Sequence, residues 1–351
     1  MNPPDANQPA PARLALWENA SARARQSRFA KMSRGGRRFR RTCLGMLRAG
    51  GGVILIAIVL STTRQATSPA PLHSEVIREA APDPSVPRPA ERVKQYAWLS
   101  KEARRTYVPL YDRIREPVGF TRVKLAPGGF GDWLRYLPVA PEGTPVTTAK
   151  RQVVLPPDDP ALAAAIALQP SGQRLLTAAN MVIRLRGEYC WAAGVADRIG
   201  FHFTSGHFFD WRSWADGVRA EVKGRNVTLN RTTLVDESRS NFCCYLETIF
   251  RYATVYSLYK DTQPAGDSAI EAGDVLIKLG QPGHAVMVLD VATDDAGHVI
   301  ALLGQGGTPA QTFHVVRCSA GSPWFPIAYS QPIDLGKRGV FQVKDLRHWA
   351  N

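Results

Sequence analysis

The sequence predicts an α+β fold preceded by one N-terminal membrane segment. In the middle of the chain apolar residues recur at helical spacing, and a block of β-rich runs follows from Gly273 to Cys318. Helical segments followed by a separate strand block are typical of the α+β class. A third observation, a basic run that leads into an uncharged apolar window, predicts the membrane segment. With 351 residues, 44% of them hydrophobic, the chain is long enough to bury a sizeable core.

The membrane prediction depends on the distribution of charge near the N-terminus. The formal net charge of the chain is +14, and residues 1–51 alone hold 11 basic and 2 acidic side chains. The run RGGRRFRR leads into AGGGVILIAIVLSTT, residues 49–63, which carries no charge. The positive-inside rule keeps residues 1–48 in the cytoplasm as a basic leader. We therefore expect a membrane protein whose folded domain lies outside the cytoplasm, with residues 49–63 in contact with the membrane.

Residues 49–63 could be a transmembrane anchor or a cleaved signal peptide. A membrane-spanning helix needs about 20 apolar residues, whereas the apolar core of a signal peptide is shorter. The alternative is therefore secretion after cleavage. Residues 64–91 are rich in Pro, Ala and Ser, cannot fill a core, and are expected to form a linker. The basic residues precede an apolar segment instead of lying among aromatic groups on a folded face, so no nucleic-acid partner is expected.

The folded α+β domain is expected at residues 92–351. VGFTRV and RQVVLP predict strands, and SGQRLLTAANMVIRLRGEYCW predicts the best helix, Ser171–Trp191. A second helix is expected at about residues 236–260. The runs DVLIKLG, AVMVLDVA, HVIALLGQ and TFHVVRC are separated by Gly, Pro and Asp, and they predict antiparallel strands.

Several separated phrases carry a resemblance to a known family: FGDWLRYLPV, VIRLRGEY, FHFTSG, GDVLIKLGQPGHAVMVLDVA and PAQ-x-x-H. They resemble an uncharacterised bacterial family, domain of unknown function 4846, from about Glu116 to Trp349. More distantly, the order of helix and strand block is similar to papain-like cell-wall cysteine peptidases and amidases. In those enzymes a cysteine opens the helix, a histidine opens the second strand of the block, and a third polar residue follows one strand later. The resemblance implies a papain-like core, with a helix packed on an antiparallel sheet.

This resemblance implies that His284 is a base and that Gln305 orients it. An imidazole needs an acceptor that fixes its tautomer, and Gln305 ends the strand after the one that His284 opens. Asp290 competes for the orienting role, but it lies six residues along the same strand, roughly 20 Å from His284 if extended. We expect Asp290 to close the strand in a turn. His202, in FHFTSG, either lines the same pocket or caps a loop. The competing interpretation of His284 is a core or turn histidine.

The expected nucleophile is missing. The helix of the resembled family opens with a Gln-Cys-Ala-Asp phrase, and counting back from RLRGEY this sequence has Thr177-Ala178-Ala179-Asn180. Ala178 occupies the nucleophile position, and Asn180 becomes a possible pocket residue. Because a methyl group cannot attack a carbonyl, the resemblance implies a non-catalytic domain that binds a cell-envelope peptide or glycan.

The alternative is an active cysteine or serine hydrolase of amide or ester bonds. Cys243 and Cys244 are expected to open the second helix, where the helix N-terminus favours a thiolate, so either could serve His284. They could equally lie on an apolar helix face or form a disulfide with Cys190 or Cys318.

No metal or cofactor is expected. The sequence has no Cys-x-x-Cys pair, and His202 with His207 is weak support for a metal site. The glycines of GQGG and GGFG lack the Lys-Ser/Thr or the strand-to-helix context of a phosphate loop.

Overall fold

The structure, a computed structural model, describes residues 95–350 except 169–176, 267 and 282. The expected basic leader (1–48), membrane segment (49–63) and linker (64–91) lie outside these residues. Among the helices that are described, none has the length and apolar character needed to cross a bilayer.

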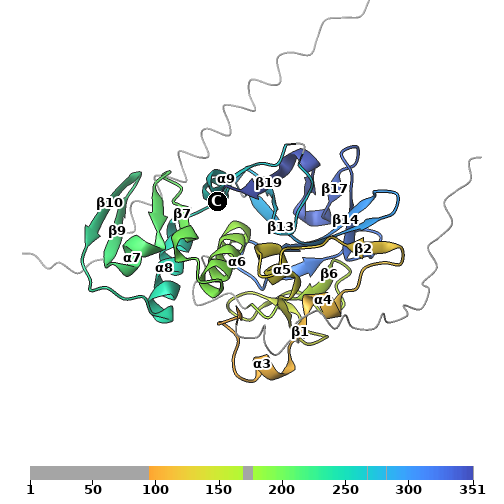
Figure 1. Cartoon of the computed structure of the whole chain (residues 1–351), viewed down its shortest axis with the longest axis horizontal. Helices are drawn as coiled ribbons and strands as arrows, with labels where there is room; N and C mark the ends of the chain where they lie inside the picture. The colour runs from red at the N-terminus through yellow and green to blue at the C-terminus, as the bar shows by residue number, and fades with distance from the viewer. Residues whose placement is uncertain (1–94, 169–176, 267, 282, 351) are drawn as a thin grey trace, which may run out of the picture. The chain divides into compact units, whose positions relative to one another are not determined.

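The described domain is built around a nine-stranded antiparallel sheet (Figure 1). Its main path runs through β11 (Thr262–Pro264), β19 (Leu346–Trp349), β12 (Val275–Lys278), β13 (His284–Asp294), β14 (Val299–Gln305), β15 (His314–Val316) and β6 (Leu162–Ala165). Two further strands join it: β2 (Phe120–Arg122) pairs with β13, and β16 (Trp324–Ile327) pairs with β14. The predicted α+β class with antiparallel strands is confirmed, because helices cover a sheet whose ladders are all antiparallel.

Strand β13 is the longest strand of the sheet and separates two apolar cores. Alternate side chains of a strand point to opposite faces. Ala285, Met287 and Leu289 lie in the core on one face, and Val286 and Val288 lie in the core on the other. A β-bulge next to Asp290 then shifts this alternation by one residue. Val291 and Ala292 therefore each face the side of the sheet opposite to the one that strict alternation would give them.

The longest helices of the described residues are joined to β13 directly or through α6. The helix α6 (Ala178–Ala192) packs against β13, and the N-cap Thr177 accepts a hydrogen bond from the backbone of Asn180. The single helix expected at residues 236–260 is two helices, α8 (Arg239–Tyr252) and α9 (Val255–Asp261). They are separate because Thr254 and Ser257 form a capping box that starts α9. The expected helix start at Ser171 falls partly outside the described residues, and the described part begins at Ala178.

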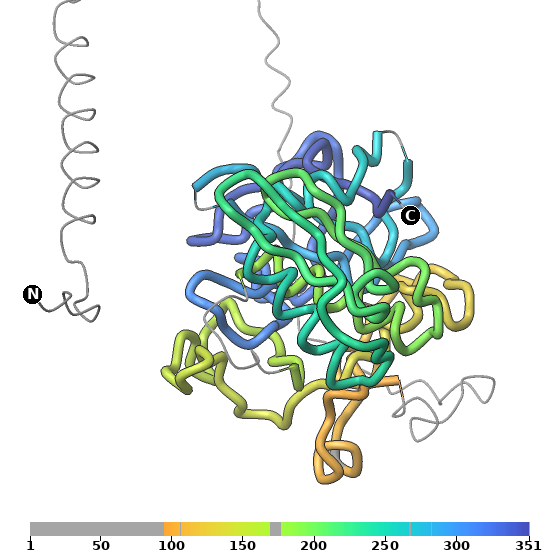
Figure 2. Tube along the Cα trace, turned by 90° about the vertical axis from the view of Figure 1, so that its left-hand side faces the viewer, coloured from red at the N-terminus to blue at the C-terminus, as the bar shows by residue number. Residues whose placement is uncertain are grey.

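The remaining elements are short and lie around the sheet. They are α3 (Ala103–Thr106), β1 (Val108–Pro109), α4 (Leu110–Arg113), α5 (Phe130–Arg135), β3 (Pro138–Val139), β4 (Val146–Thr147), β5 (Val153–Leu155), η2 (Ala196–Arg198), β7 (Gly200–His202), β8 (Phe208–Asp210), α7 (Trp211–Ala215), β9 (Val218–Lys223), β10 (Asn226–Arg231), β17 (Ile333–Asp334), η3 (Gly336–Arg338), β18 (Val340–Phe341) and η4 (Val343–Asp345). The VGFTRV strand is β2 and the RQVVLP strand is β5. Figure 2 shows the green middle of the chain, which includes β9 and β10, in front of the blue C-terminal strands.

Candidate functional site

A short hydrogen bond joins the start of β13 to the end of β14. His284 Nε2 lies 2.6 Å from Gln305 Oε1. An amide oxygen can only accept, so in the neutral imidazole the proton is on Nε2 and the lone pair is on Nδ1. A glycine precedes His284 because β13 lies close to α9 here. A Cβ added to Gly283 would be 2.4 Å from Cγ1 of Val255.

A second histidine fixes the orientation of the Gln305 amide. His314, on β15, is directly opposite Gln305 in the ladder and is completely buried. Its Nδ1 lies 3.1 Å from the carbonyl oxygen of Thr312, which can only accept, so Nδ1 carries the proton. Its Nε2 is then an acceptor for the Gln305 amide nitrogen, 3.4 Å away. We call this series, from Thr312 through His314 and Gln305 to His284, the relay.

Both imidazoles of the relay are held neutral. Burial lowers the pKa of His314 to about 4, and the nearby guanidinium of Arg338 acts in the same direction. Burial also lowers the pKa of His284, against the opposing effect of its hydrogen bond to Gln305, and Arg338 lowers it further. At neutral pH the free lone pair of His284 Nδ1 is therefore available as a base or as a hydrogen-bond acceptor.

The first turn of α6 lies against the loop that follows Gln305. Gly306 comes next in the chain, and a Cβ added to it would lie 3.6 Å from the Cα of Ala178 and 2.9 Å from Cγ of Met181. The structure thus brings Ala178 close to the relay. The Ala178 side chain is buried. Asn180 is buried too, but its amide nitrogen donates to the carbonyl of Phe250 at 3.0 Å, which ties α6 to the end of α8.

A cavity of about 380 Å³ opens beside the helix start. None of the described residues that line it is charged. They include Thr177, Thr204, Thr254, Tyr256, Gly283 and Thr308. Threonine hydroxyls and an aromatic ring around an otherwise apolar cavity can hold an uncharged side chain and hydrogen-bond to a peptide or sugar.

The expectation that Asp290 closes β13 in a turn is wrong. The strand continues to Asp294, and Asp290 lies at the bulge, where it is 1% exposed. It accepts from Arg135 Nε at 2.9 Å and Nη2 at 2.6 Å, and Arg122 Nε lies 3.2 Å away. Two guanidinium groups compensate the negative charge of the buried Asp290 carboxylate, so the strand can continue here without exposing Asp290 to solvent.

His202 does not line the cavity. It lies at the end of β7, where its Nδ1 is 2.5 Å from Asp261 Oδ1 on α9. Burial raises the pKa of Asp261 to about 6, and the hydrogen bonds from His202 oppose that rise. The pair attaches β7 to α9. Thr204, two residues later, is the part of FHFTSG that reaches the cavity.

The structure does not bring Cys243 and Cys244 to His284. The charged groups that act on Cys243 are Arg239 on its own helix and Glu188 and Arg184, which lie in the later turns of α6. Burial raises the pKa of the Cys243 thiol, which is the opposite of activation. Cys243, Cys244, Cys190 and Cys318 are all free, so the described cysteines form no disulfide.

Three residues of this region were not predicted from the sequence. His314 lies in the PAQ-x-x-H phrase, but its role depends on the register between β14 and β15. Gln311 and Arg338 meet beside Gly307: the Gln311 amide oxygen accepts from Arg338 Nη1 at 3.1 Å and Nη2 at 3.0 Å, once the amide is turned so that its oxygen faces these donors. Arg338 comes from the tip of the β17–β18 hairpin, and no local pattern marks it.

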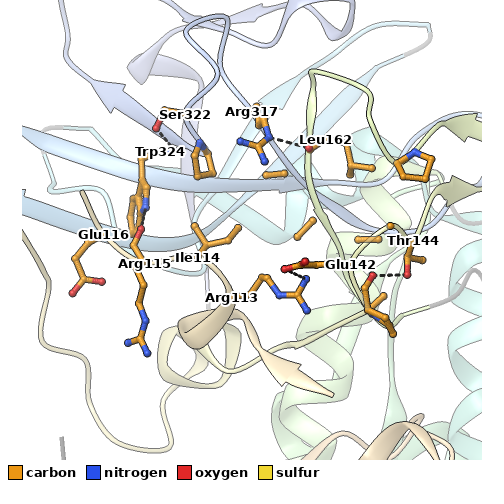
Figure 3. Close-up of a pocket in the computed structure, with 18 of the residues that line it drawn as sticks. Arg113, Ile114, Arg115, Glu116, Glu142, Thr144, Leu162, Arg317, Ser322 and Trp324 are labelled. Carbon is orange, nitrogen blue, oxygen red and sulfur yellow. Dashed lines mark hydrogen bonds and ion pairs between the residues drawn. The ribbon is translucent and has the colours of Figure 1, made fainter. Parts of the chain in front are cut away.

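A larger cavity, about 560 Å³, lies on another part of the sheet, beside β6 and β16 (Figure 3). Arg317 Nε there donates to the carbonyl of Leu162 at 3.0 Å, and Arg113 forms an ion pair of 3.4 Å with Glu142. The arginines of this cavity are occupied by partners. Unlike the cavity of about 380 Å³, it is not lined by Thr177 or Gly283, the chain neighbours of Ala178 and His284. Within residues 95–350, outside the gaps given above, no three His, Cys, Asp or Glu side chains are grouped to hold a metal ion.

Comparison with protein families identifies the domain that carries this site. The family model described as Domain of unknown function (4846) matches residues 110–348. The chain belongs to this family. The matched residues of the DUF4846 domain include the first turn of α6, the relay and Arg338. No curated protein and no solved structure gives a significant match.

Proposed function

We propose that this DUF4846 protein is a non-catalytic papain-like domain that binds a peptide or glycan of the bacterial cell envelope beside His284. The relay is the observation that carries the proposal. It leaves a lone pair on His284 Nδ1, the state that a papain-like base needs, although the residue at the helix start is Ala178. Binding functions need no nucleophile, whereas cysteine chemistry does.

The cavity beside the helix start supports a ligand of this class. Its lining is uncharged, with threonine hydroxyls and the ring of Tyr256 around it. Such a surface can accept a small side chain and hydrogen-bond to the amides of a peptide or the hydroxyls of a sugar.

The proposal includes a location. Residues 49–63 would anchor the protein in the bacterial inner membrane, or be cleaved on export, and would leave the domain outside the cytoplasm. A reporter enzyme that is active only outside the cytoplasm, fused after Asn351, tests this. Activity is expected, and an inactive fusion of a stably produced protein would contradict the location.

The second candidate is a hydrolase that uses Cys243 or Cys244. The exposure of both thiols favours it, because a reagent or substrate can reach them. Two observations oppose it. The pKa of the Cys243 thiol is raised, and the charged groups that act on this thiol include Glu188 and Arg184, which follow the first turn of α6.

Binding of cell-wall fragments by the full-length protein tests the proposal. We expect calorimetry with soluble fragments of digested cell wall to detect binding, and mass spectrometry to find those fragments intact afterwards. Tyr256→Ala should weaken binding about tenfold, the effect of removing one aromatic contact from a binding site. Tyr259→Ala is the matched control, because it removes a similarly exposed ring from the same helix, outside the cavity.

Two results would contradict the proposal. One is the absence of binding by a folded protein. The other is the release of new termini from the fragments, lost in Cys243→Ser or Cys244→Ser, which would establish the hydrolase instead.

A further inference from the structure

We propose that the site holds its ligand by a carboxylate, the C-terminal carboxylate of a peptide, bound between Arg338 and His284. This inference rests on the proposed function and specifies the ligand. It starts from the position of Arg338 in η3, at the tip of the β17–β18 hairpin. A Cβ added to Gly307 would lie 2.7 Å from Arg338 Nη1. Gly307 is two residues after Gln305, so the guanidinium lies beside the relay.

Arg338 is a partly buried cation that forms no ion pair with the described residues. No carboxylate of the described residues lies within 4.0 Å of it, and its hydrogen-bonding partner among them is the Gln311 amide oxygen. That oxygen accepts from Nη1 and Nη2, so three of the five N–H groups of a guanidinium stay available. Two other partly buried arginines, by contrast, are paired with carboxylates: Arg135 with Asp290, and Arg239 with Glu188.

The groups that contact Arg338 are polar and neutral. Burial lowers the pKa of Arg338, and the carboxylate of Asp159, which lies beyond ion-pair distance, opposes that shift. Burial, with a smaller contribution from the Arg338 charge, lowers the pKa of both His284 and His314, so neither imidazole of the free protein competes as a cation at neutral pH. Gln311 is 1% exposed and presents its oxygen to the guanidinium. A buried charge that is left unpaired is costly. An incoming anion would remove that cost, and a planar carboxylate matches the forked donors of arginine best.

The location of the proposed carboxylate site, next to Ala178, favours the C-terminal end of a peptide as the ligand. In a papain-like arrangement the thiolate is the anion beside the histidine, and here a methyl group replaces it. A ligand carboxylate beside Ala178 would restore one negative charge next to Arg338. His284, neutral in the free protein, would have to take up a proton on Nδ1 to donate to that carboxylate, as an imidazolium does beside a thiolate. A peptide that ends at this point would place its last residues toward the uncharged cavity of about 380 Å³. A side-chain carboxylate offers the same chemistry, so the experiment must distinguish the two.

The test compares three alanine-based probes on the full-length protein. They are acetyl-Ala-Ala-Ala with a free carboxylate, the same peptide as a C-terminal amide, and acetyl-Ala-Asp-Ala amide, which carries only a side-chain carboxylate. Binding is followed by calorimetry and by the nitrogen chemical shifts of isotope-labelled histidine. The variants are Arg338→Gln and the matched control Lys337→Gln, its exposed neighbour in the same turn.

We expect the free acid to bind at least about tenfold more tightly than its amide, as a charge-assisted hydrogen bond to Arg338 predicts. The His284 nitrogen resonances should shift toward those of a protonated imidazole, because Nδ1 must carry a proton to donate to the carboxylate. Arg338→Gln should remove this difference between acid and amide, and Lys337→Gln should keep it. Equal binding of acid and amide by the wild-type protein would overturn the inference, as would an equal loss for both in Arg338→Gln or no binding of the acid. Tight, Arg338-dependent binding of the aspartyl amide would overturn the C-terminal assignment.

These outcomes separate the inference from the proposed function. If acid and amide bind equally, the peptide site stands and the carboxylate contact is wrong. If cell-wall fragments fail to bind as well, both are wrong.

Discussion

His314 determines the proton positions of the site, although its side chain is completely buried. Its hydrogen bond to the Thr312 carbonyl decides which of its nitrogens is protonated. The amide of Gln305 then has one orientation that satisfies both of its neighbours. The state of His284 therefore follows from a backbone carbonyl two residues before His314.

The buried neutral state of His314 predicts a pH dependence of stability. The unfolded chain protonates a histidine near pH 6.5, whereas the native pKa of His314 is about 4. Between these values the unfolded state binds more protons, so the free energy of unfolding falls as the pH falls. The shift corresponds to a loss of about 3 kcal/mol across this range.

Denaturant unfolding at a series of pH values, for the wild-type protein and His314→Gln, measures this effect. Asp261 and Asp274 have native pKa values raised to about 6, which gives slopes of opposite sign. These slopes occur in both proteins and cancel in the difference. The difference between the two unfolding free energies should shrink from pH 6.5 to pH 4, and parallel curves would show that His314 is not held neutral.

At the scale of elements, the start of α6 was indicated by the family resemblance and not by periodicity. Apolar spacing began the helix at Ser171, whereas the described helix begins at Ala178, the position that the resemblance gives to the helix opening. The end of β13 was predicted poorly. A local pattern that ends in Asp suggests a turn, whereas Asp290 is compensated by Arg135 and Arg122 from distant parts of the sequence. A bulge stabilised by long-range partners leaves no local signal.

Removing the N-cap side chain of α6 should weaken ligand binding, whereas removing that of α8 should not. Thr177→Ala removes the side-chain acceptor for the Asn180 backbone N–H, and Ser238→Ala removes the equivalent acceptor for Asn241. Each substitution should lower the free energy of unfolding by about 1 kcal/mol or less. Only Thr177→Ala should also weaken the binding of cell-wall fragments, because Thr177 lines the cavity. Calorimetry alongside thermal unfolding measures both effects, and equal binding losses in the two variants would refute the assignment.

At the scale of the whole molecule, the site is assembled from segments that are far apart in the sequence. Ala178, His284 and Gln305 could be singled out from the sequence because each lies in or beside a phrase that carries the family resemblance. The β14–β15 register and the β17–β18 hairpin carry no local pattern, so the role of His314 and the presence of Arg338 could not. Register and hairpin placement depend on how the sheet packs as a unit. The α+β class was predictable because it needs only the order of helices and strands.

The central claim is that the start of α6 and His284 form a papain-like pair from which the nucleophile is missing. Restoring the thiol tests this most directly. Ala178→Cys is made in a protein whose exposed Cys243 and Cys244 are replaced by serine, with and without His284→Ala. The thiolate absorbance and the rate of alkylation by a small reagent are then followed against pH.

We expect the thiol introduced by Ala178→Cys to have a pKa below the ordinary value of about 8.5, because the helix N-terminus and the imidazole stabilise the thiolate. In the His284→Ala background the pKa should return toward that value. A thiol with an ordinary or raised pKa that is the same with and without His284 would contradict the central claim.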